Sequence, residues 1–428
     1  MKHSILDKIV WPVIIACIFI RPFICDSAFT YLNFVIINIF IIASFLYLYS
    51  KNIKSTAIDV AVMAFLVVVF ISALVAAGKT NNTNELYNYI ALITLFYVVR
   101  AAGKENRKTI AFTIIISAVF VSLYSLRALF VVSNYALKYL STHHISYPFA
   151  EEFIKRGRAF SPFISPNLLA GYLVMIIFLC CGIITQRFKE NKTALNDNPN
   201  MRFSKIKKVY SSMFHKKIDY ITIVAGLCIV LSSVTLFFTK SIGGWLVLTI
   251  CAFLYLIFIK KLNKKSIAVL FFITLILSAV FIIRNQGQEY FTRPAFSVHK
   301  RLNYWRQTVH IITLHPLKGT GIGNFSLKES RTSHNSYLQI WAEMGASGIA
   351  IWLIIVFLFI KREIKKLPGY GLYYNAGIFT AGLAFIFHNV IDFSFFTAQG
   401  SFLWWIILAL TASLNKKSHQ VTTSQGHK

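Results

Sequence analysis

Long apolar runs dominate this chain and restrict it to one class of fold. Runs of about 17–25 residues with few charges recur along its 428 residues, and each can cross roughly 30 Å of hydrocarbon. Inside lipid every backbone polar group needs a partner within the protein, and a helix supplies those partners locally. A membrane β-barrel would instead show shorter segments of alternating hydrophobicity. The sequence therefore predicts an all-α, polytopic integral membrane protein.

The apolar runs predict about twelve transmembrane helices. We place them at residues 9–25, 29–50, 57–77, 86–101, 109–133, 165–185, 219–238, 242–260, 266–284, 346–360, 370–390 and 396–414. Lysine and arginine accumulate in cytoplasmic loops. If both termini lie in the cytoplasm, every second loop is a basic cytoplasmic one. The charge pattern thus predicts cytoplasmic N- and C-termini.

This topology divides the chain into five regions. They are 1–133 with the first five helices, 134–164 as a first long outer loop, 165–284 with helices six to nine and a basic cytoplasmic loop at 186–218, 285–345 as a second long outer loop, and 346–428 with the last three helices and a cytoplasmic tail. We expect the second outer loop to contain short amphipathic helices and the chemistry of the protein.

Composition excludes several other classes of protein. Only 14% of the residues are charged and 56% are hydrophobic, whereas a soluble domain carries nearer a quarter charged. The net charge of +29 is explained by basic cytoplasmic loops, so no nucleic-acid partner is expected. The six cysteines lie in or beside apolar runs without metal-like spacing, which indicates packing residues. Arg21 and Pro22 interrupt the first run before a cleavage site, which predicts an uncleaved first helix.

The two long outer loops are more basic than the topological bias predicts. An anionic ligand at the outer membrane face would explain this. The candidate cations are Arg158 in the first loop, and Arg301 and Arg306 in the second. Lys240 is a lone cation in the turn between the seventh and eighth helices. For Arg301, the alternative is an interfacial arginine that extends its charge towards water.

An amphipathic helix is predicted in the second outer loop, ending before Pro316. Its apolar face recurs at helical spacing and comprises Leu302, Trp305, Val309 and Ile312. The following glycine-rich segment 318–324 does not have the spacing of a nucleotide-binding P-loop and has no strand before it. We therefore expect a tight turn there, whose backbone N–H groups could also face an anion.

His334 is the candidate general base. Ser333 is predicted to cap a short helix, which would place His334 in the first helical turn. The positive end of the helix dipole disfavours an imidazolium, and a neutral imidazole is what a general base needs. The alternative is a histidine with a structural capping role.

Two further places carry polar residues near the outer face. Asn167 follows two prolines where the sixth predicted helix begins. His388 and Asp392 lie one helical turn apart at the outer end of the eleventh predicted helix, so their side chains could pair.

These residues carry a resemblance to a known family. His334-Asn335, nine residues and then Gly345-x-x-Gly348, preceded by RLNYWRQTVHIITLHPLKGTGIGNF, resembles the O-antigen ligase / O-antigen polymerase superfamily. SPNLLAGYL in the sixth predicted helix and HNVIDFSF near the end are also similar to it. The resemblance covers roughly residues 155–400 and is specific to the superfamily rather than to one member.

The resemblance implies transfer of a glycan from polyprenyl (undecaprenyl) pyrophosphate at the periplasmic face of a bacterial inner membrane. His334 would activate the hydroxyl of an acceptor such as lipid A–core, and Arg301 would hold the pyrophosphate. The superfamily often has an arginine next to the position of Ser241. Ile242 stands there in this chain, and Lys240 is the nearest cation.

We expect further substrate contacts from Lys240, Arg158, Asn167, Asn335, Arg306, His388 and Asp392, with Arg156 as another candidate cation. Acidic residues on the outer side are scattered, so we predict metal-independent transfer without a cofactor. A direct displacement would invert the anomeric carbon. The expected partners are the lipid-linked donor, the glycan acceptor and membrane lipids.

Several alternatives remain within this interpretation. A polysaccharide polymerase or a protein O-oligosaccharyltransferase of the same superfamily would use the same donor with another acceptor. A transporter or flippase of lipid-linked sugars belongs to a different class and would place charges at the bilayer midplane on broken helices. Apart from Arg127, most predicted helix interiors are apolar, which favours the enzyme. The compact outer loop favours a ligase.

Overall fold

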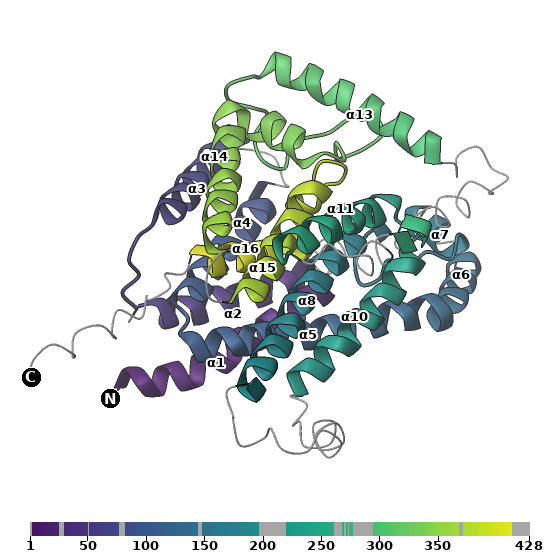
Figure 1. Cartoon of the computed structure of the whole chain (residues 1–428). Coiled ribbons are helices and arrows are strands. Elements are labelled where there is room, and N and C mark those ends of the chain that lie inside the picture. Colours follow the sequence, from purple (N-terminus) through teal and green to yellow (C-terminus); the bar gives the residue numbers. More distant parts are fainter. Residues whose placement is uncertain are drawn as a thin grey trace, which may run out of the picture.

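The computed structural model of the chain is built from helices in the residues that it describes (Figure 1). Those residues are 2–24, 30–49, 51–76, 82–143, 148–196, 220–260, 294–367 and 371–412, with 268, 271, 272 and 274–276. The all-α fold class is thereby confirmed for these ranges. The described cysteines are free thiols, in agreement with the packing role predicted for them.

The described residues of the first half of the chain form eight α-helices. They are α1 (Lys2–Ile20), α2 (Thr30–Leu48), α3 (Ala57–Val75), α4 (Asn82–Ala101), α5 (Lys104–Arg127), α6 (Ser133–Thr142), α7 (Pro148–Lys155) and α8 (Pro166–Asn196). A 3-10 turn, η1 (Arg21–Phe23), follows α1. A π-helical segment, η2 (Ala128–Val132), joins α5 to α6. The predicted linker at 186–218 is thus helical up to Asn196, and 197–218 lie outside the described residues.

In the second half, the described residues contribute six more α-helices. They are α10 (Tyr220–Thr239), α11 (Ile242–Phe258), α13 (Pro294–Leu314), α14 (Ser336–Lys366), α15 (Leu372–His388) and α16 (Ala398–Ala412), with the 3-10 turn η5 (Ser394–Phe396) before the last. The predicted end of the amphipathic helix before Pro316 is confirmed by α13.

Six of the described helical stretches are long and apolar enough to cross a membrane. They are Tyr31–Leu48, Ala57–Val75, Lys104–Thr142, Pro166–Glu190, Tyr220–Thr239 and Ser336–Lys366. Two more apolar helices, Ile242–Phe258 and Ala398–Ala412, are shorter. A polytopic membrane protein is therefore supported, whereas the number twelve is not confirmed. Most of the predicted ninth span, 266–284, lies outside the described residues.

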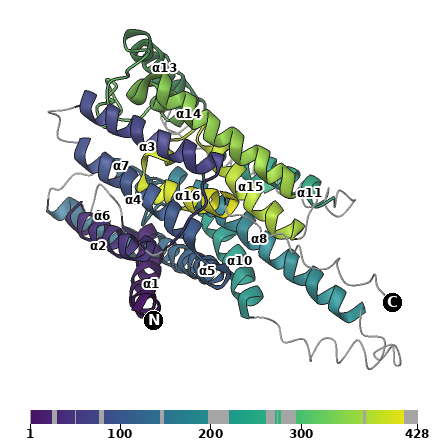
Figure 2. The ribbon, with the colours of Figure 1, turned by 90° about the vertical axis from the view of Figure 1, so that its left-hand side faces the viewer.

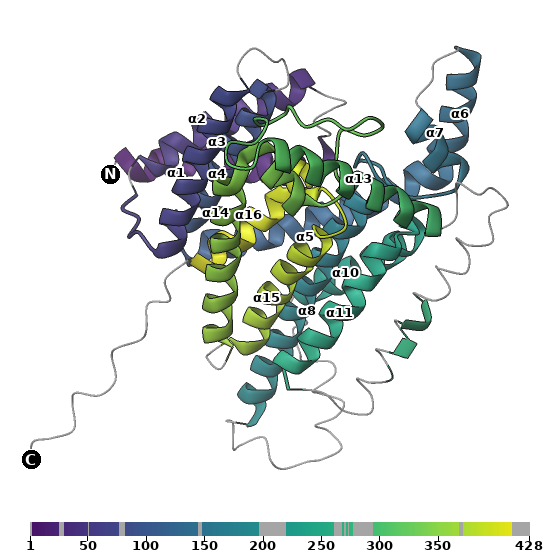
Figure 3. The ribbon, with the colours of Figure 1, turned by 90° about the horizontal axis from the view of Figure 1, so that it is seen from above.

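Helix α8 lies at the centre of the bundle, between α10 and α15 (Figure 3). Its contact with α15 is close because two glycines face each other: a Cβ atom on Gly182 would lie 2.8 Å from the Cα atom of Gly377. Such small residues let membrane helices approach each other closely. The packing fixes the end of α15, which carries His388, against the beginning of α8, which carries Asn167.

Helix α14 begins ten residues earlier than the predicted tenth span. It starts at Ser336, runs beside α3 (Figure 2) and bends at Gly345, which has a positive φ of 67°. Helix α13 packs on α14 and lies across one end of the bundle in Figure 1. Its buried side is formed by Tyr304, Thr308 and Ile312, while Leu302 and Val309 are exposed. The predicted apolar stripe therefore coincides with the side of α13 that is buried in the protein only at Ile312.

Gly345→Ala should strongly destabilise the fold. The residue has a left-handed φ, and an added Cβ atom would clash with the backbone carbonyl oxygen of Leu317. We expect a loss of about 2 kcal/mol or more, measured as a lower Tm of the purified protein. Gly226→Ala is the matched control because a Cβ atom there meets no atom within 4 Å. Equal Tm values for the two variants would contradict the steric argument.

Candidate active site

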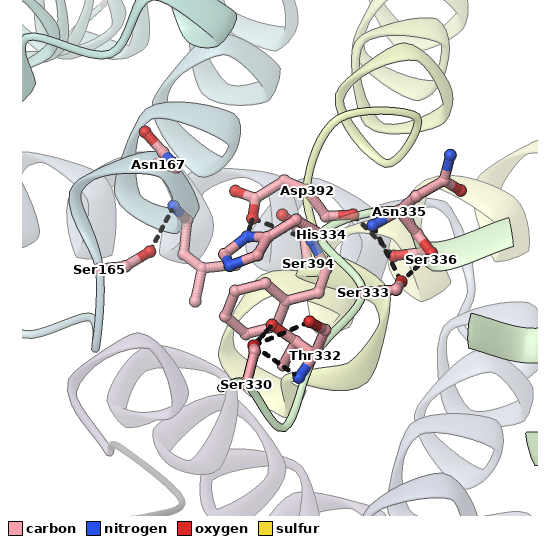
Figure 4. Close-up of polar contacts among 12 residues, drawn as sticks. Ser165, Asn167, Ser330, Thr332, Ser333, His334, Asn335, Ser336, Asp392 and Ser394 are labelled. Atoms are coloured by element: carbon pink, nitrogen blue, oxygen red, sulfur yellow. Dashed lines mark hydrogen bonds and ion pairs between the residues drawn. The ribbon is translucent and has the colours of Figure 1, made fainter. Parts of the chain in front are cut away.

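His334 lies in a tight turn just before α14. Its φ of 52° is left-handed, a conformation that non-glycine residues rarely adopt. The turn is closed by Ser333, whose Oγ donates to the carbonyl oxygen of Asn335 at 2.6 Å and accepts from its N–H at 3.1 Å (Figure 4). Strained backbone of this kind is concentrated at functional sites. The turn holds the imidazole in one place.

The helix cap is Asn335 and not the predicted Ser333. The Asn335 side-chain oxygen accepts from the N–H groups of Tyr337 and Leu338 at 3.0 and 3.1 Å. His334 therefore precedes the cap and does not lie in the first helical turn. Asn335 has a structural role in this geometry, because its side-chain oxygen is engaged by the helix.

Asp392 lies between two histidines. Its Oδ1 atom is 3.7 Å from Nδ1 of His334 (Figure 4). Its Oδ2 atom is 3.8 Å from Nδ1 of His388. Asp392 and His388 are each 1% exposed, whereas the side chain of His334 is 27% exposed. The predicted proximity of His388 and Asp392 is thus present, and Asp392 also faces the candidate base.

The turn that carries Asp392 is tied to the start of α14. The Ser336 N–H donates to the carbonyl oxygens of Asn389 and Asp392 at 2.9 and 3.1 Å. Its hydroxyl donates to the side-chain oxygen of Asn389 at 2.6 Å. Because Ser336 is two residues from His334, these bonds fix the base relative to the carboxylate.

Helix α13 covers this site. The ring of Tyr304 stacks on His334 with centroids 5.9 Å apart, and Phe393 meets the same imidazole edge-on at 5.2 Å. Arg301 lies one helical turn before Tyr304 and interacts electrostatically with Asp392. Its guanidinium makes no hydrogen bond or ion pair to any residue that the structure describes.

Charge and burial act in opposite directions at these groups. Burial lowers the pKa of Arg301, and the carboxylate of Asp392 offsets part of that effect. Burial also opposes ionisation of Asp392, but His334, His388 and Arg301 together hold its pKa below the ordinary value. The carboxylate is therefore ionised at neutral pH, and Arg301 is a partly dehydrated cation that a second anion could neutralise.

Asp392→Asn should change how stability depends on pH. A carboxyl whose pKa is lowered by folding stabilises the protein above its unfolded pKa and loses this contribution as the pH falls through the folded value. We expect the Tm of the wild type to decrease below about pH 4 more steeply than that of Asp392→Asn. Thermal melts in detergent from neutral pH to acid measure this. Parallel curves would contradict the assigned ionisation.

A second polar cluster joins the segment between α7 and α8 to the turn after α10. The guanidinium of Arg158, which is 8% exposed, donates to the carbonyl oxygen of Thr239 at 2.9 Å and to Asn167 Oδ1 at 3.4 Å. Ser241 Oγ donates to the same Asn167 oxygen at 2.9 Å. Lys240 Nζ donates to the carbonyl oxygen of Arg156 at 2.7 Å.

A cavity of about 310 Å³ opens beside this cluster. Its walls come from η2, α7 and α10, and its lining residues are mainly apolar, including Phe130, Ile154 and Phe238. Lys155 and Lys240 supply positive charge to the lining. A long apolar chain with an anionic head matches this combination.

The glycine-rich segment is a turn, as predicted, and several of its N–H groups donate hydrogen bonds within the protein. Thr320 N–H donates to the carbonyl oxygen of Ala342 at 2.8 Å, Gly321 N–H to that of Glu343 at 2.9 Å, and Gly323 N–H to Glu343 Oε2 at 3.1 Å. These groups fasten the segment to α14 and do not face an anion.

Comparison with protein families matches this part of the chain. Residues 227–353 fit the family model described as O-antigen ligase. This match supports membership of the O-antigen ligase / O-antigen polymerase superfamily. The matched segment includes Lys240, Arg301 and His334. Comparisons with curated proteins and with solved structures gave no match.

Residues outside the matched segment complete the candidate site. His334 and Arg301 fall within the match, while His388 and Asp392 lie beyond residue 353. The structure brings these four together. Asn167 is adjacent, because Gly171, one turn further along α8, lies against His388.

The other predicted site residues lie elsewhere. Lys240 and Arg158 form the second cluster with Asn167, and Arg156 pairs with Glu152 at 2.5 Å. Arg306 is exposed on α13.

Sequence reasoning missed three contacts at the site. Tyr304 was not assigned to it, although its spacing one turn after Arg301 was a usable signal. The Gln339 side chain accepts from the Ser333 N–H at 3.2 Å and donates to Glu343 Oε1 at 2.8 Å. These two bonds connect the turn that carries His334 to the side of α14. Nothing in the spacing of these residues predicts these hydrogen bonds.

Proposed function

We propose that this superfamily member is a membrane glycosyltransferase that moves a glycan from a polyprenyl pyrophosphate to an acceptor hydroxyl at the outer membrane face. One observation carries the proposal. His334 is fixed with its buried Nδ1 facing Asp392, beside the partly dehydrated guanidinium of Arg301. A base next to an anion-seeking cation suits transfer with an anionic leaving group.

His334 acts as the general base in this mechanism. The Asp392 carboxylate favours the tautomer with hydrogen on Nδ1, which leaves a lone pair on Nε2. Nε2 accepts the proton of the acceptor hydroxyl while the hydroxyl oxygen attacks the anomeric carbon. Asp392 stabilises the imidazolium that forms. This single displacement would invert the anomeric carbon, so a product with retained configuration would exclude it.

Arg301 receives the leaving group. The bond between the anomeric carbon and the pyrophosphate oxygen breaks, and the electron pair departs with the polyprenyl pyrophosphate. A guanidinium offers two parallel N–H donors to phosphate oxygens. Because α13 holds Arg301 near the reacting atoms, the developing charge meets a cation already in place.

The cavity beside Lys240 would take the first units of the polyprenyl chain. Its apolar walls suit an isoprenoid, and Lys240 would accompany the second phosphate. Lys240 lines this cavity, whereas Arg156 and Arg158 are not among its lining residues, so Lys240 is the better candidate in this cluster. The contact of Asn167 with Ser241 keeps this turn next to the α8 end that supports His388.

Metal-independent transfer belongs to this proposal. Among the described residues, no three His, Cys, Asp or Glu side chains gather as ligands would. Arg301 and Lys240 would supply the positive charge instead. Undiminished transfer in the presence of a chelator is the expected result.

The test uses purified protein in detergent with polyprenyl-pyrophosphate-linked glycan and lipid A–core. Glycan attached to lipid A–core would support the ligase, which we favour. Glycan chains that lengthen on the carrier would identify a polymerase with the same site. Transfer to an added acceptor protein would identify a protein O-oligosaccharyltransferase.

A transporter is the candidate from another class. If an intact protein forms none of these products, the same preparation in vesicles would be assayed for movement of the lipid-linked glycan between leaflets. Movement without transfer would overturn the enzyme proposal.

A further inference from the structure

His388 is buried at the end of α15 with its ring directed at Asp392. Its Nδ1 atom lies 3.8 Å from Asp392 Oδ2 and 3.3 Å from Ser394 Oγ. At 1% exposure it cannot reach a substrate in the way that His334 can. A contact with substrate, which the sequence suggested for His388, therefore does not fit this geometry. The charged group that its ring faces is the carboxylate of Asp392.

The two oxygens of Asp392 face different partners. Oδ1 accepts from the N–H of Phe393 at 2.9 Å and faces His334 at 3.7 Å. Oδ2 is buried and has no hydrogen-bond partner among the described residues, and the Nδ1 atom of His388 is the nearby polar group. Without His388 the carboxylate could rotate and turn Oδ1 away from His334.

Gly171 on α8 forms the support for the His388 ring. A Cβ atom at Gly171 would lie 2.7 Å from His388 Nδ1 and 2.9 Å from its Cε1. Those distances are shorter than van der Waals contact, so the imidazole lies flat against bare backbone. Any larger residue at position 171 would push the ring out of place.

We propose that His388, seated on Gly171, is a positioning residue that fixes the Asp392 carboxylate so that it orients the base His334. The proposal rests on the transferase function proposed above. The proposed role connects α8, α15 and the turn that carries His334. It also assigns Gly171 a role in the reaction, which its position on a packed helix does not suggest.

The first test compares two substitutions of His388, one that keeps a ring without nitrogen atoms and one that keeps an N–H donor without the ring. His388→Phe keeps a ring but removes both nitrogens, and we expect kcat to fall about 10- to 100-fold, as for other residues that orient a reacting group. The KM of the donor should stay within about 2-fold, because Arg301 is untouched. His388→Asn retains an N–H donor near the position of Nδ1 and should recover most of the rate. Equal losses in both variants would overturn the proposal.

Double-mutant cycles separate positioning from a general structural role. If His388 acts through Asp392, then His388→Phe should change kcat less than about 2-fold in an Asp392→Asn background. If Gly171 acts through His388, Gly171→Ala should lower kcat about 10-fold in the wild type and have no effect beside His388→Ala. Gly226→Ala, the same change in open space, is the control. Additive effects in both cycles would overturn the proposal.

A Tm cycle on the same variants distinguishes this inference from the proposed function. Coupling between His388→Phe and Asp392→Asn in Tm would support the contact even if the wild type transferred no glycan. In that case the transferase function alone would fail. Additive Tm changes together with an active wild type would refute the positioning role alone.

Discussion

His334→Ala is expected to abolish measurable glycan transfer, with a loss of about 100- to 10,000-fold. The acceptor hydroxyl would then have no base to take its proton, since Asp392 lies behind the imidazole and is buried. Arg301 would still hold the pyrophosphate, so the KM of the donor should change little. The measurement is the initial rate of product formation with purified protein.

The fold should survive this substitution. His334 lies in a turn outside the helices with 27% of its side chain exposed, and alanine, although less common than histidine at a left-handed φ, removes no packed core group. His310→Ala, an exposed histidine on α13, is the matched control and should transfer at the wild-type rate. An unchanged rate in His334→Ala would exclude the base. A comparable loss in His310→Ala would indicate a general effect on α13.

Added imidazole offers a second check on His334. If the residue supplies only a base, a small imidazole that enters the space vacated in His334→Ala should restore part of the lost rate. No restoration should occur in Asp392→Asn, where the native ring still fills the space. Restoration of both variants would point to a solution effect of imidazole.

The apolar runs were sufficient to predict where most helices lie because burial of backbone in lipid leaves few options. The apolar runs did not predict the start of α14. Residues 336–345 contain Gln339 and Glu343, which break the apolar run, yet both are buried where α14 meets the glycine-rich turn. Hydrogen bonds supplied by distant segments, such as the Ser72 hydroxyl to the Glu343 carbonyl at 3.0 Å, make polar helix possible there.

The choice of cap shows a similar limit. Ser333 and Asn335 are both good capping residues, so their sequence cannot decide between them. The decision comes from Ser336, whose bonds to Asn389 place the helix start two residues later. His334 therefore does not lie in the first turn of α14, where the helix dipole was expected to act on it. It lies beside the Asp392 carboxylate.

The side of α13 that packs into the protein could not be read from its apolar stripe. Apolar residues on a helix near lipid do not have to point into the protein. Leu302 and Val309 are exposed, and the buried side uses Tyr304 and Thr308. Part of the candidate site was nevertheless predictable: the His388–Asp392 pair came from spacing, and the roles of Arg301 and His334 were implied by the family resemblance. Their convergence required the packing of α8, α13 and α15.

Arg301→Lys is expected to lower kcat about 100-fold despite conserving the charge. Lysine lacks the planar guanidinium that binds two phosphate oxygens at once. Its compact ammonium is also more costly to dehydrate on the buried side of α13. The electrostatic interaction with Asp392 would also change, because an ammonium of different length would sit at another distance from the carboxylate. The loss should appear mainly in kcat, since the charge on the leaving pyrophosphate develops during the reaction.

Arg306→Lys is the matched control for this result. Arg306 lies on the same helix and is exposed, so the same substitution there should change kcat less than about 2-fold. If Arg301→Lys also behaved as the wild type, two-point binding of pyrophosphate would be the wrong role. A rise in the KM of the donor with kcat unchanged would instead assign Arg301 to ground-state binding. A fall in kcat at Arg301 alone is the outcome that places this guanidinium at the breaking bond.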